Sequence, residues 1–163
     1  LLPLWKDLLD TGLITRRLFK DMLNTPPYRL PNAGDEGSRL VDAVPGSFFM
    51  LKPGLLTPQD IEGLFDSRIF LYYEEKVLGR KFQEMGLKTV LVTDESYVHA
   101  HSATIDKSLK RMVDKQRLLH QSKLYYYREY LHAGPALMAA AGVALDIILA
   151  EVWFLTVVCR MRW

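Results

Sequence analysis

The stretch LYYEEKVLGRKFQEMGLKTVLV, residues 71–92, combines a helix signal with a strand signal. Apolar residues recur at the helical period over residues 71–85, and Gly86 follows as the residue type that commonly ends a helix. Residues 88–92 are then rich in β-branched side chains, which favour an extended strand. A helix followed closely by a strand predicts a chain of the α/β class.

Weaker signals for helices, strands and loops lie on both sides of this stretch. Residues 4–23 predict two helical pieces interrupted at Gly12, and residues 24–38, which contain three prolines, predict a long surface loop. Residues 41–52, VDAVPGSFFMLK, are apolar and rich in β-branched and aromatic side chains. They predict one or two buried strands broken near Pro45-Gly46. Downstream, Thr57 before Pro58 predicts the start of a short helix, and Tyr97-Val98 is a weaker strand candidate.

The C-terminal third predicts two long helices of different character. Residues 104–132 carry seven Lys or Arg against three acidic residues, and residues 133–159 are strongly apolar. The longest charge-free run in the apolar segment has 13 residues, fewer than the roughly 20 that a membrane-spanning helix needs. Asp146 and Glu151 lie about 140° apart on a helix and so do not form one polar face. We therefore expect this helix to lie against protein or against a membrane surface.

The composition excludes several classes of protein. An apolar fraction of 49% and a charged fraction of 25% in 163 residues exclude wholesale disorder and suit one domain or a large piece of one. The net charge of +2 gives no reason to expect nucleic-acid binding. Cys159 is the single cysteine, so an intrachain disulfide and a cysteine-based zinc site are excluded. The sequence contains no P-loop, dinucleotide-binding, nucleophile-elbow or zinc-protease motif, and no Asp-x-Asp.

Two carboxylates at the start of the central helix are the first candidate site. On a helical projection Glu75 falls within the apolar stripe of that helix, and Glu74 lies at its edge. A carboxylate turned toward apolar surroundings has a raised pKa, which suits a group that accepts a proton near neutral pH. The alternative is an exposed acidic pair that is favoured at a helix N-terminus by the helix dipole.

Two histidines form the second candidate site. In a strand His99 and His101 would point to the same face, where two imidazoles can share a metal ion or a phosphate. The alternative is a pair of ordinary surface or half-buried histidines.

These pieces, in this order, resemble the C-terminal half of a family 2 glycosyltransferase with the GT-A fold. The similarity is to bacterial enzymes that build capsular or other cell-surface polysaccharides, including rhamnosyltransferase-like members. The matching stretches are Val44 to Lys52, Gly63-Leu64-Phe65-Asp66 with Ile69-Phe70-Leu71-Tyr72, Glu74-Glu75, Arg80 to Gly86, and Tyr97-Val98-His99 with Ser102. The resemblance covers residues 40–105 well and the flanks loosely.

The resemblance implies a partial GT-A-like domain with short mixed strands, several helices and a long C-terminal helical region. Residues 1–132 would be the acceptor-side half, and residues 133–163 an apolar C-terminal helix that associates with membrane. The family's nucleotide-binding half, with its Asp-x-Asp, has no counterpart in these 163 residues. We therefore expect this chain alone to bind the donor weakly and to be inactive.

The resemblance also implies roles for individual residues. Glu75 would be the catalytic base, with Glu74 beside it as the other acid of the pair. Metal binding maps best to His99, with His101 as its competitor, and the ion would be Mg²⁺ or Mn²⁺. Contact with the acceptor or the donor sugar is implied for Gly46, Ser47, Asp66 and Tyr72.

The implied activity is inverting, metal-dependent transfer of a sugar from a nucleotide-diphosphate donor to a cell-surface glycan or lipid-linked acceptor. The expected location is cytoplasmic, peripheral at the inner face of the cell membrane, in contact with anionic lipid. No nucleic-acid partner is expected, and homo-oligomerisation stays open. The rival hypothesis is a non-catalytic module that docks on membrane or on a partner helix through residues 104–163.

Overall fold

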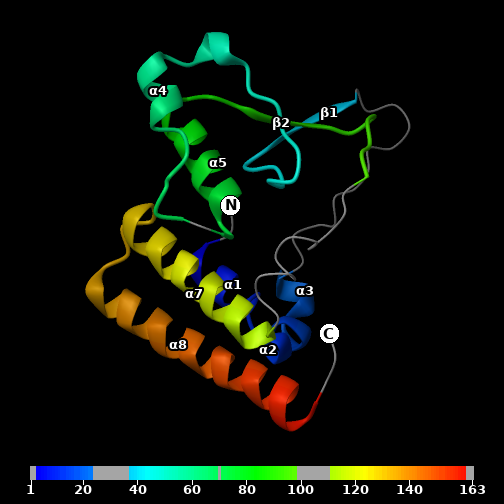
Figure 1. Cartoon of the computed structure of the whole chain (residues 1–163), viewed down its shortest axis with the longest axis vertical. Coiled ribbons are helices and arrows are strands. Elements are labelled where there is room, and N and C mark those ends of the chain that lie inside the picture. Colours follow the sequence, from blue (N-terminus) through cyan, green and yellow to red (C-terminus); the bar gives the residue numbers. More distant parts are fainter. Residues whose placement is uncertain (1–2, 24–36, 70, 99–110, 161–163) are drawn as a thin grey trace. The chain divides into compact units, whose positions relative to one another are not determined.

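The structure, a computed structural model, describes residues 3–23, 37–69, 71–98 and 111–160 (Figure 1). The chain divides into two compact units. Residue 1 and residues 28–100 form one, here called the sheet unit, and residues 2–27 and 101–163 form the other, the helical unit. This division differs from the expected boundary at residue 133. The two long C-terminal helices pack on each other and therefore belong to the same unit.

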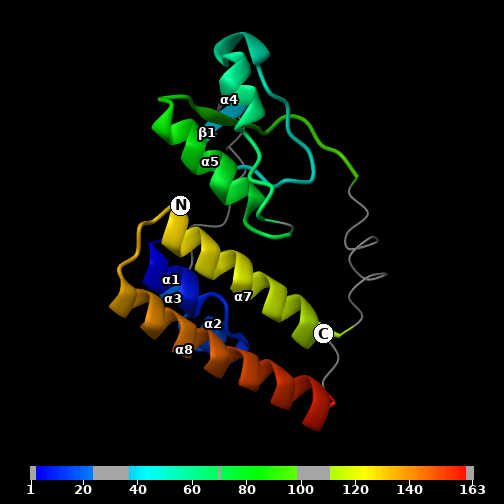
Figure 2. The same cartoon turned by 60° about the vertical axis from the view of Figure 1, so that its left-hand side comes forward.

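The described residues of the sheet unit form a two-stranded antiparallel sheet and three short helical elements (Figure 2). Ser38 lies opposite Val92, and Val41 lies opposite Thr89. The helices and the sheet confirm the mixed helix and strand content expected of the chain, and β2 confirms the strand predicted near residue 90. The elements in chain order are β1 (Ser38–Val41), η1 (Pro53–Leu55), α4 (Pro58–Glu62), α5 (Glu74–Glu84) and β2 (Thr89–Val92).

The prediction of buried strands over residues 41–52 was wrong. Only Val41 belongs to a strand, residues 46–47 form a turn, and Met50 is 83% exposed. The aromatic side chains that suggested a strand pack on other rings instead. Phe48 lies on Tyr97 with ring centroids 5.4 Å apart, and Phe49 lies 6.4 Å from Phe65. Residues 97–98, the weaker strand candidate, are irregular as well.

The helix ends follow local chemistry. Thr57 begins α4 with a capping box: its hydroxyl accepts from the Asp60 backbone N–H at 3.2 Å, and Asp60 Oδ2 accepts from the Thr57 N–H at 2.8 Å. The predicted end of α5 is also confirmed, because Gly86 has φ of +71°, a left-handed conformation that glycine adopts without strain. The start of α5 falls at Glu74, three residues later than predicted. Tyr72 and Tyr73 both have positive φ, which is incompatible with a right-handed helix.

Close packing fixes α5 within the sheet unit. Gly79 is buried on α5 and lies so near residues 42–43 that a Cβ there would overlap the Asp42 carbonyl oxygen. On the other side, Lys81 Nζ donates to the carbonyl oxygens of Gly63 and Leu64 at 2.7 and 3.2 Å. The helix is therefore held both to the chain after β1 and to the segment after α4.

We predict that Gly79→Ala destabilises the sheet unit by about 2 kcal/mol, because the added methyl group must displace backbone atoms. Gly142→Ala is the matched control: it also lies inside a helix, but its Cβ position is open, so we expect about 1 kcal/mol of stabilisation. The measurement is urea unfolding followed by circular dichroism. Equal stability of the two variants would show that the Gly79 contact is not tight.

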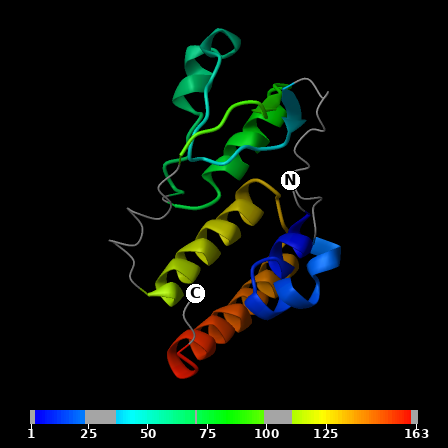
Figure 3. The same ribbon diagram turned by 90° about the vertical axis from the view of Figure 1, so that its right-hand side faces the viewer.

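Among its described residues, the helical unit contains three short N-terminal helices, two long C-terminal helices and a π-helical segment after the second of them (Figures 2 and 3). The predicted break at Gly12 is confirmed, since this residue lies just before the second helix. The long helices run side by side, and one face of α8 is buried at helical spacing through Ala141, Leu145, Ile148 and Val152. The elements are α1 (Leu4–Leu9), α2 (Leu13–Leu18), α3 (Lys20–Leu23), α7 (Met112–Glu129), α8 (Pro135–Trp153) and the π-helical η2 (Phe154–Val158).

A buried polar cluster joins the N-terminal helices to α7. Lys123 Nζ donates to the Asp7 carbonyl oxygen at 2.8 Å, to Asp7 Oδ2 at 3.1 Å and to the Thr11 hydroxyl. The hydroxyl of the fully buried Tyr127 donates to Asp7 Oδ2 at 2.6 Å. Since Asp7 and Lys123 are both buried, each depends on the other for charge compensation.

We predict that Asp7→Asn lowers the free energy of unfolding by about 3 kcal/mol, because the Lys123 ammonium would stay buried without a counter-charge. Asp10→Asn is the control. Its carboxylate pairs with the exposed Arg16, and its loss should cost less than about 0.5 kcal/mol. Both values can be measured by urea unfolding, and similar losses for the two variants would contradict the assigned role of Asp7.

Candidate functional site

A hollow of about 200 Å³ lies in the sheet unit beside the start of α5. It contains two of the carboxylates that the sequence singled out, Asp66 after α4 and Glu74 at the first position of α5. The structure therefore brings together two motifs that are separate in the sequence. The hollow is lined by Leu64, Phe65, Asp66, Ser67, Ile69, Glu74 and Val77.

Asp66 is held in a fixed orientation at the hollow. Its side chain is 6% exposed and accepts from the Arg68 backbone N–H at 3.0 Å. The Arg68 guanidinium also donates to both carboxylate oxygens, at 3.1 and 3.3 Å. A two-point pair of this kind fixes the plane of the carboxylate as well as its position.

Glu74 has an unusual protonation equilibrium for a helix N-terminus. Glu74 is an exposed residue, but partial desolvation of its carboxyl group by the surrounding protein raises the pKa of Glu74 above the ordinary value. The charge of Glu75 acts in the same direction, while backbone N–H groups at the start of α5 oppose it. A carboxyl group with a raised pKa binds a proton more readily at neutral pH, as an acceptor of a substrate proton must.

Glu75 is half-buried, and Glu74 rather than Glu75 lines the hollow. The apolar stripe predicted around Glu75 forms only in part. Leu78 is buried, but Met85 is exposed and Leu71 lies before the helix begins. Because α5 begins at Glu74, both Glu74 and Glu75 lie on its first turn. No helical turn precedes Glu75, so the apolar stripe cannot extend to its N-terminal side.

The other candidate residues of the sheet unit, Tyr72, Gly46 and Ser47, do not line the hollow. Tyr72 is half-buried and has φ of +66°, directly before α5. Gly46 and Ser47 form an exposed turn, in which the Ser47 hydroxyl hydrogen-bonds to the Tyr97 hydroxyl. Neither residue of this turn lines the hollow that contains Asp66 and Glu74.

The metal candidates His99 and His101 lie outside the described residues. Within residues 3–23, 37–69, 71–98 and 111–160, no group of three His, Cys, Asp or Glu side chains is arranged to hold a metal ion.

A second titratable cluster, which the sequence reading missed, lies between α7 and α8. Burial lowers the pKa of His120 to about 4, and the nearby Lys123 ammonium adds to this effect while the Asp146 carboxylate opposes it. Gln116 Nε2 lies 3.0 Å from His120 Nε2, so the neutral ring accepts a hydrogen bond there. The four-residue spacing of Gln116 and His120 on one helix is the only local sequence signal for this cluster.

We predict that His120 makes the helical unit sensitive to acid. The folded state binds a proton at His120 only near pH 4, whereas the unfolded chain binds it near pH 6.5, so falling pH favours unfolding between these values. At pH 4 this difference destabilises the folded state by about 3 kcal/mol relative to neutral pH, because each unit of pKa difference is worth about 1.4 kcal/mol. His120→Gln should flatten the dependence of unfolding free energy on pH in this window, whereas His132→Gln, at an exposed position, should leave it unchanged. Parallel pH profiles for wild type and His120→Gln would contradict the prediction.

No protein-family profile, curated protein or solved structure matches this chain. The resemblance to family 2 glycosyltransferases therefore depends on the order and spacing of the motifs between residues 44 and 102.

Proposed function

We propose that the sheet unit is the acceptor-side half of a family 2, GT-A-type glycosyltransferase that transfers a sugar from a nucleotide diphosphate to a cell-surface glycan. One observation carries the proposal: Asp66 and Glu74, which come from two separate motifs of the resemblance, line the same hollow. Asp66 lies in the irregular segment after α4 and Glu74 begins α5, and a substrate in the hollow could contact both.

The lining of the hollow suits a sugar. Carboxylates accept hydrogen bonds from sugar hydroxyl groups, and the orientation of Asp66 is already fixed by Arg68. Phe65, an exposed aromatic ring, and Ile69 give the same hollow an apolar wall for the C–H face of a pyranose. An apolar lining with a few fixed polar groups is typical of small-molecule sites.

In this proposal the acidic pair at the start of α5 acts on the acceptor. Glu75, which the motif assigns as base and which does not itself line the hollow, takes the proton of an acceptor hydroxyl at the edge of the hollow as that oxygen attacks the anomeric carbon and the nucleotide diphosphate leaves. Glu74 and Asp66 hold the acceptor by hydrogen bonds in the hollow. A divalent ion, Mg²⁺ or Mn²⁺, would neutralise charge on the leaving diphosphate, with His99 and His101 as its candidate ligands.

The proposal requires a partner region for the donor. The nucleotide-binding contacts of the family, including Asp-x-Asp, would come from sequence outside these 163 residues. An upstream reading frame that encodes parallel strands and Asp-x-Asp would support the enzyme over the rival hypothesis of a purely docking module.

We predict that Glu75→Gln lowers turnover of the complete enzyme by at least about a hundredfold, the range expected for loss of a general base. Donor affinity should change little, because glutamine keeps the shape of the side chain. Glu74→Gln should have a milder effect on turnover and should raise the acceptor KM. The measurement is steady-state sugar transfer with donor and acceptor varied in turn.

Glu84→Gln provides the control, since the exposed Glu84 lies on the same helix but pairs with the half-buried Arg80 outside the hollow. Its turnover should equal that of wild type. If Glu74→Gln causes the large loss and Glu75→Gln does not, the base is Glu74. Near-normal turnover in both variants would refute the proposed chemistry of the pair.

A further inference from the structure

The outer face of α8 and η2 is an exposed apolar stripe. The stretch Pro135–Val158 is long and apolar enough to cross a membrane, with a mean hydropathy of 2.0, yet only 22% of its most apolar window is buried in the structure. Seven residues at spacings of three or four face outward, and none of them is polar. This outer stripe consists of Ala136, Ala140, Val143, Ile147, Ala150, Phe154 and Val158, all of which are exposed.

The two acidic residues of α8 lie at the edges of the outer stripe and interact with the protein. Glu151 Oε1 accepts from the backbone N–H of Ile14 at 2.7 Å, in the first turn of α2. Asp146, although exposed, interacts electrostatically with His120 of α7. A helix that lay isolated in lipid would lose both interactions, whereas a helix that stays packed in the helical unit keeps them.

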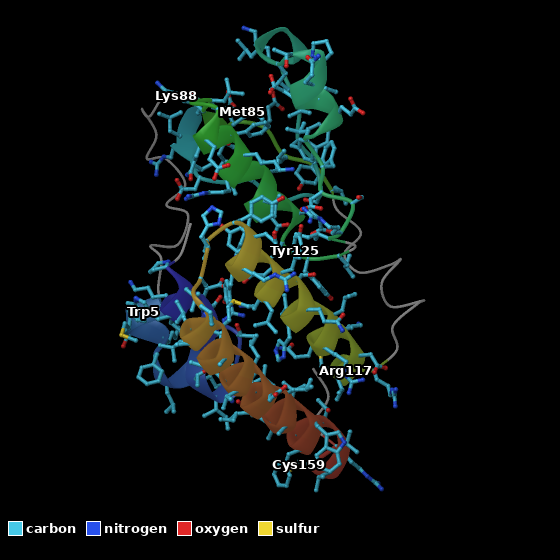
Figure 4. All side chains as sticks on the ribbon, turned by 90° about the vertical axis from the view of Figure 1, so that its left-hand side faces the viewer. Trp5, Met85, Lys88, Arg117, Tyr125 and Cys159 are labelled. Carbon is cyan, nitrogen blue, oxygen red and sulfur yellow. The ribbon has the colours of Figure 1, made fainter. Side chains whose placement is uncertain are left out.

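Basic residues border the outer stripe on the Glu151 side. There α2 and α3 expose Arg17 and Lys20 together with one acid, Asp21. The side chains of Leu18, Phe19 and Met22 on the same two helices are apolar and exposed. At the far end, Arg160 follows η2 and is also exposed. Figure 4 shows Trp5 at the outer edge of the N-terminal helices and Cys159 at the end of η2.

The helical unit also has two half-exposed tryptophans, Trp5 on α1 and Trp153 at the end of α8. Tryptophan is enriched where protein meets the headgroup region of a bilayer. The combination of an uncharged apolar stripe, a basic border and exposed tryptophans is that of a surface which binds anionic lipid in the plane of the membrane.

We propose that the helical unit docks on an anionic membrane surface, with the outer stripe of α8 and η2 in the headgroup boundary and the basic residues of α2 and α3 against the lipid phosphates. A transmembrane orientation would remove the buried face of α8, Ala141 to Val152, from α7 and would take Glu151 from α2. A second copy of the chain would cover the apolar stripe, but it would bring its own Arg17, Lys20 and Arg160 against two exposed acids, Asp21 and Asp146, and so would leave the basic charge in excess. An anionic bilayer matches both the apolar and the basic part of the surface.

The test is flotation of the whole chain with vesicles of phosphatidylcholine alone or with about 30% phosphatidylglycerol, at low and at high salt. We expect flotation with the anionic vesicles at low salt and release at high salt. Arg17→Gln with Lys20→Gln should weaken binding about 25-fold, since each basic residue near such a surface strengthens it about fivefold. Val143→Ser with Ile147→Ser should weaken it by at least about tenfold through lost apolar burial.

Leu40→Ser in the sheet unit is the matched control, because Leu40 is 66% exposed and Ile147 is 65% exposed. It should float as wild type does, and circular dichroism checks that every variant is folded. Binding that resists both high salt and alkaline extraction would overturn the proposal in favour of a membrane span. Failure to float, together with a dimer by light scattering that Val143→Ser with Ile147→Ser dissociates, would overturn it in favour of self-association. A chain that does not float and remains a monomer in solution would also overturn the proposal.

Discussion

A lysine ammonium inside a helical bundle must be surrounded by acceptors, and the arrangement of the helical unit follows from this requirement at Lys123. Its acceptors are the Asp7 carboxylate, the Asp7 carbonyl oxygen and the Thr11 hydroxyl, so α1 and the turn after it must lie against α7. This position places α2 where the Glu151 carboxylate can accept from its first turn. The inner side of α8 is then covered, and its outer stripe is left to the surroundings.

In the sheet unit the corresponding constraint lies at Tyr72 and Tyr73. Two consecutive non-glycine residues with positive φ cost free energy, and such strain persists only where surrounding contacts enforce it. Here the conformation delays the start of α5 to Glu74. The carboxylate of Glu74 is thereby placed at the helix N-terminus and at the hollow beside Asp66. A regular helix from residue 71 would have placed the acidic pair one turn into the helix.

Features with a local cause could be predicted from the sequence. The capping box at Thr57, the left-handed Gly86 and the break at Gly12 each depend on residues within one helical turn. Features with distant causes could not. The aromatic residues after Val41 suggested a strand, but Phe48 finds its partner in Tyr97, far along the chain. Likewise, no pattern near residue 7 indicates that its partner lies 116 residues away, and for this reason the sequence reading missed the buried cluster.

The division of the chain into two units has a consequence for the order of folding during synthesis. The sheet unit is continuous from residue 28 to residue 100, whereas the helical unit is assembled from both ends of the chain. The N-terminal helices emerge from the ribosome long before α7 and α8, and each is too short to be stable alone in water. The sheet unit can therefore fold first as an insertion, while residues 2–27 await their partners. Premature termination anywhere before Lys123 would leave Asp7 without its counter-charge and the N-terminal helices without the α8 surface on which they pack.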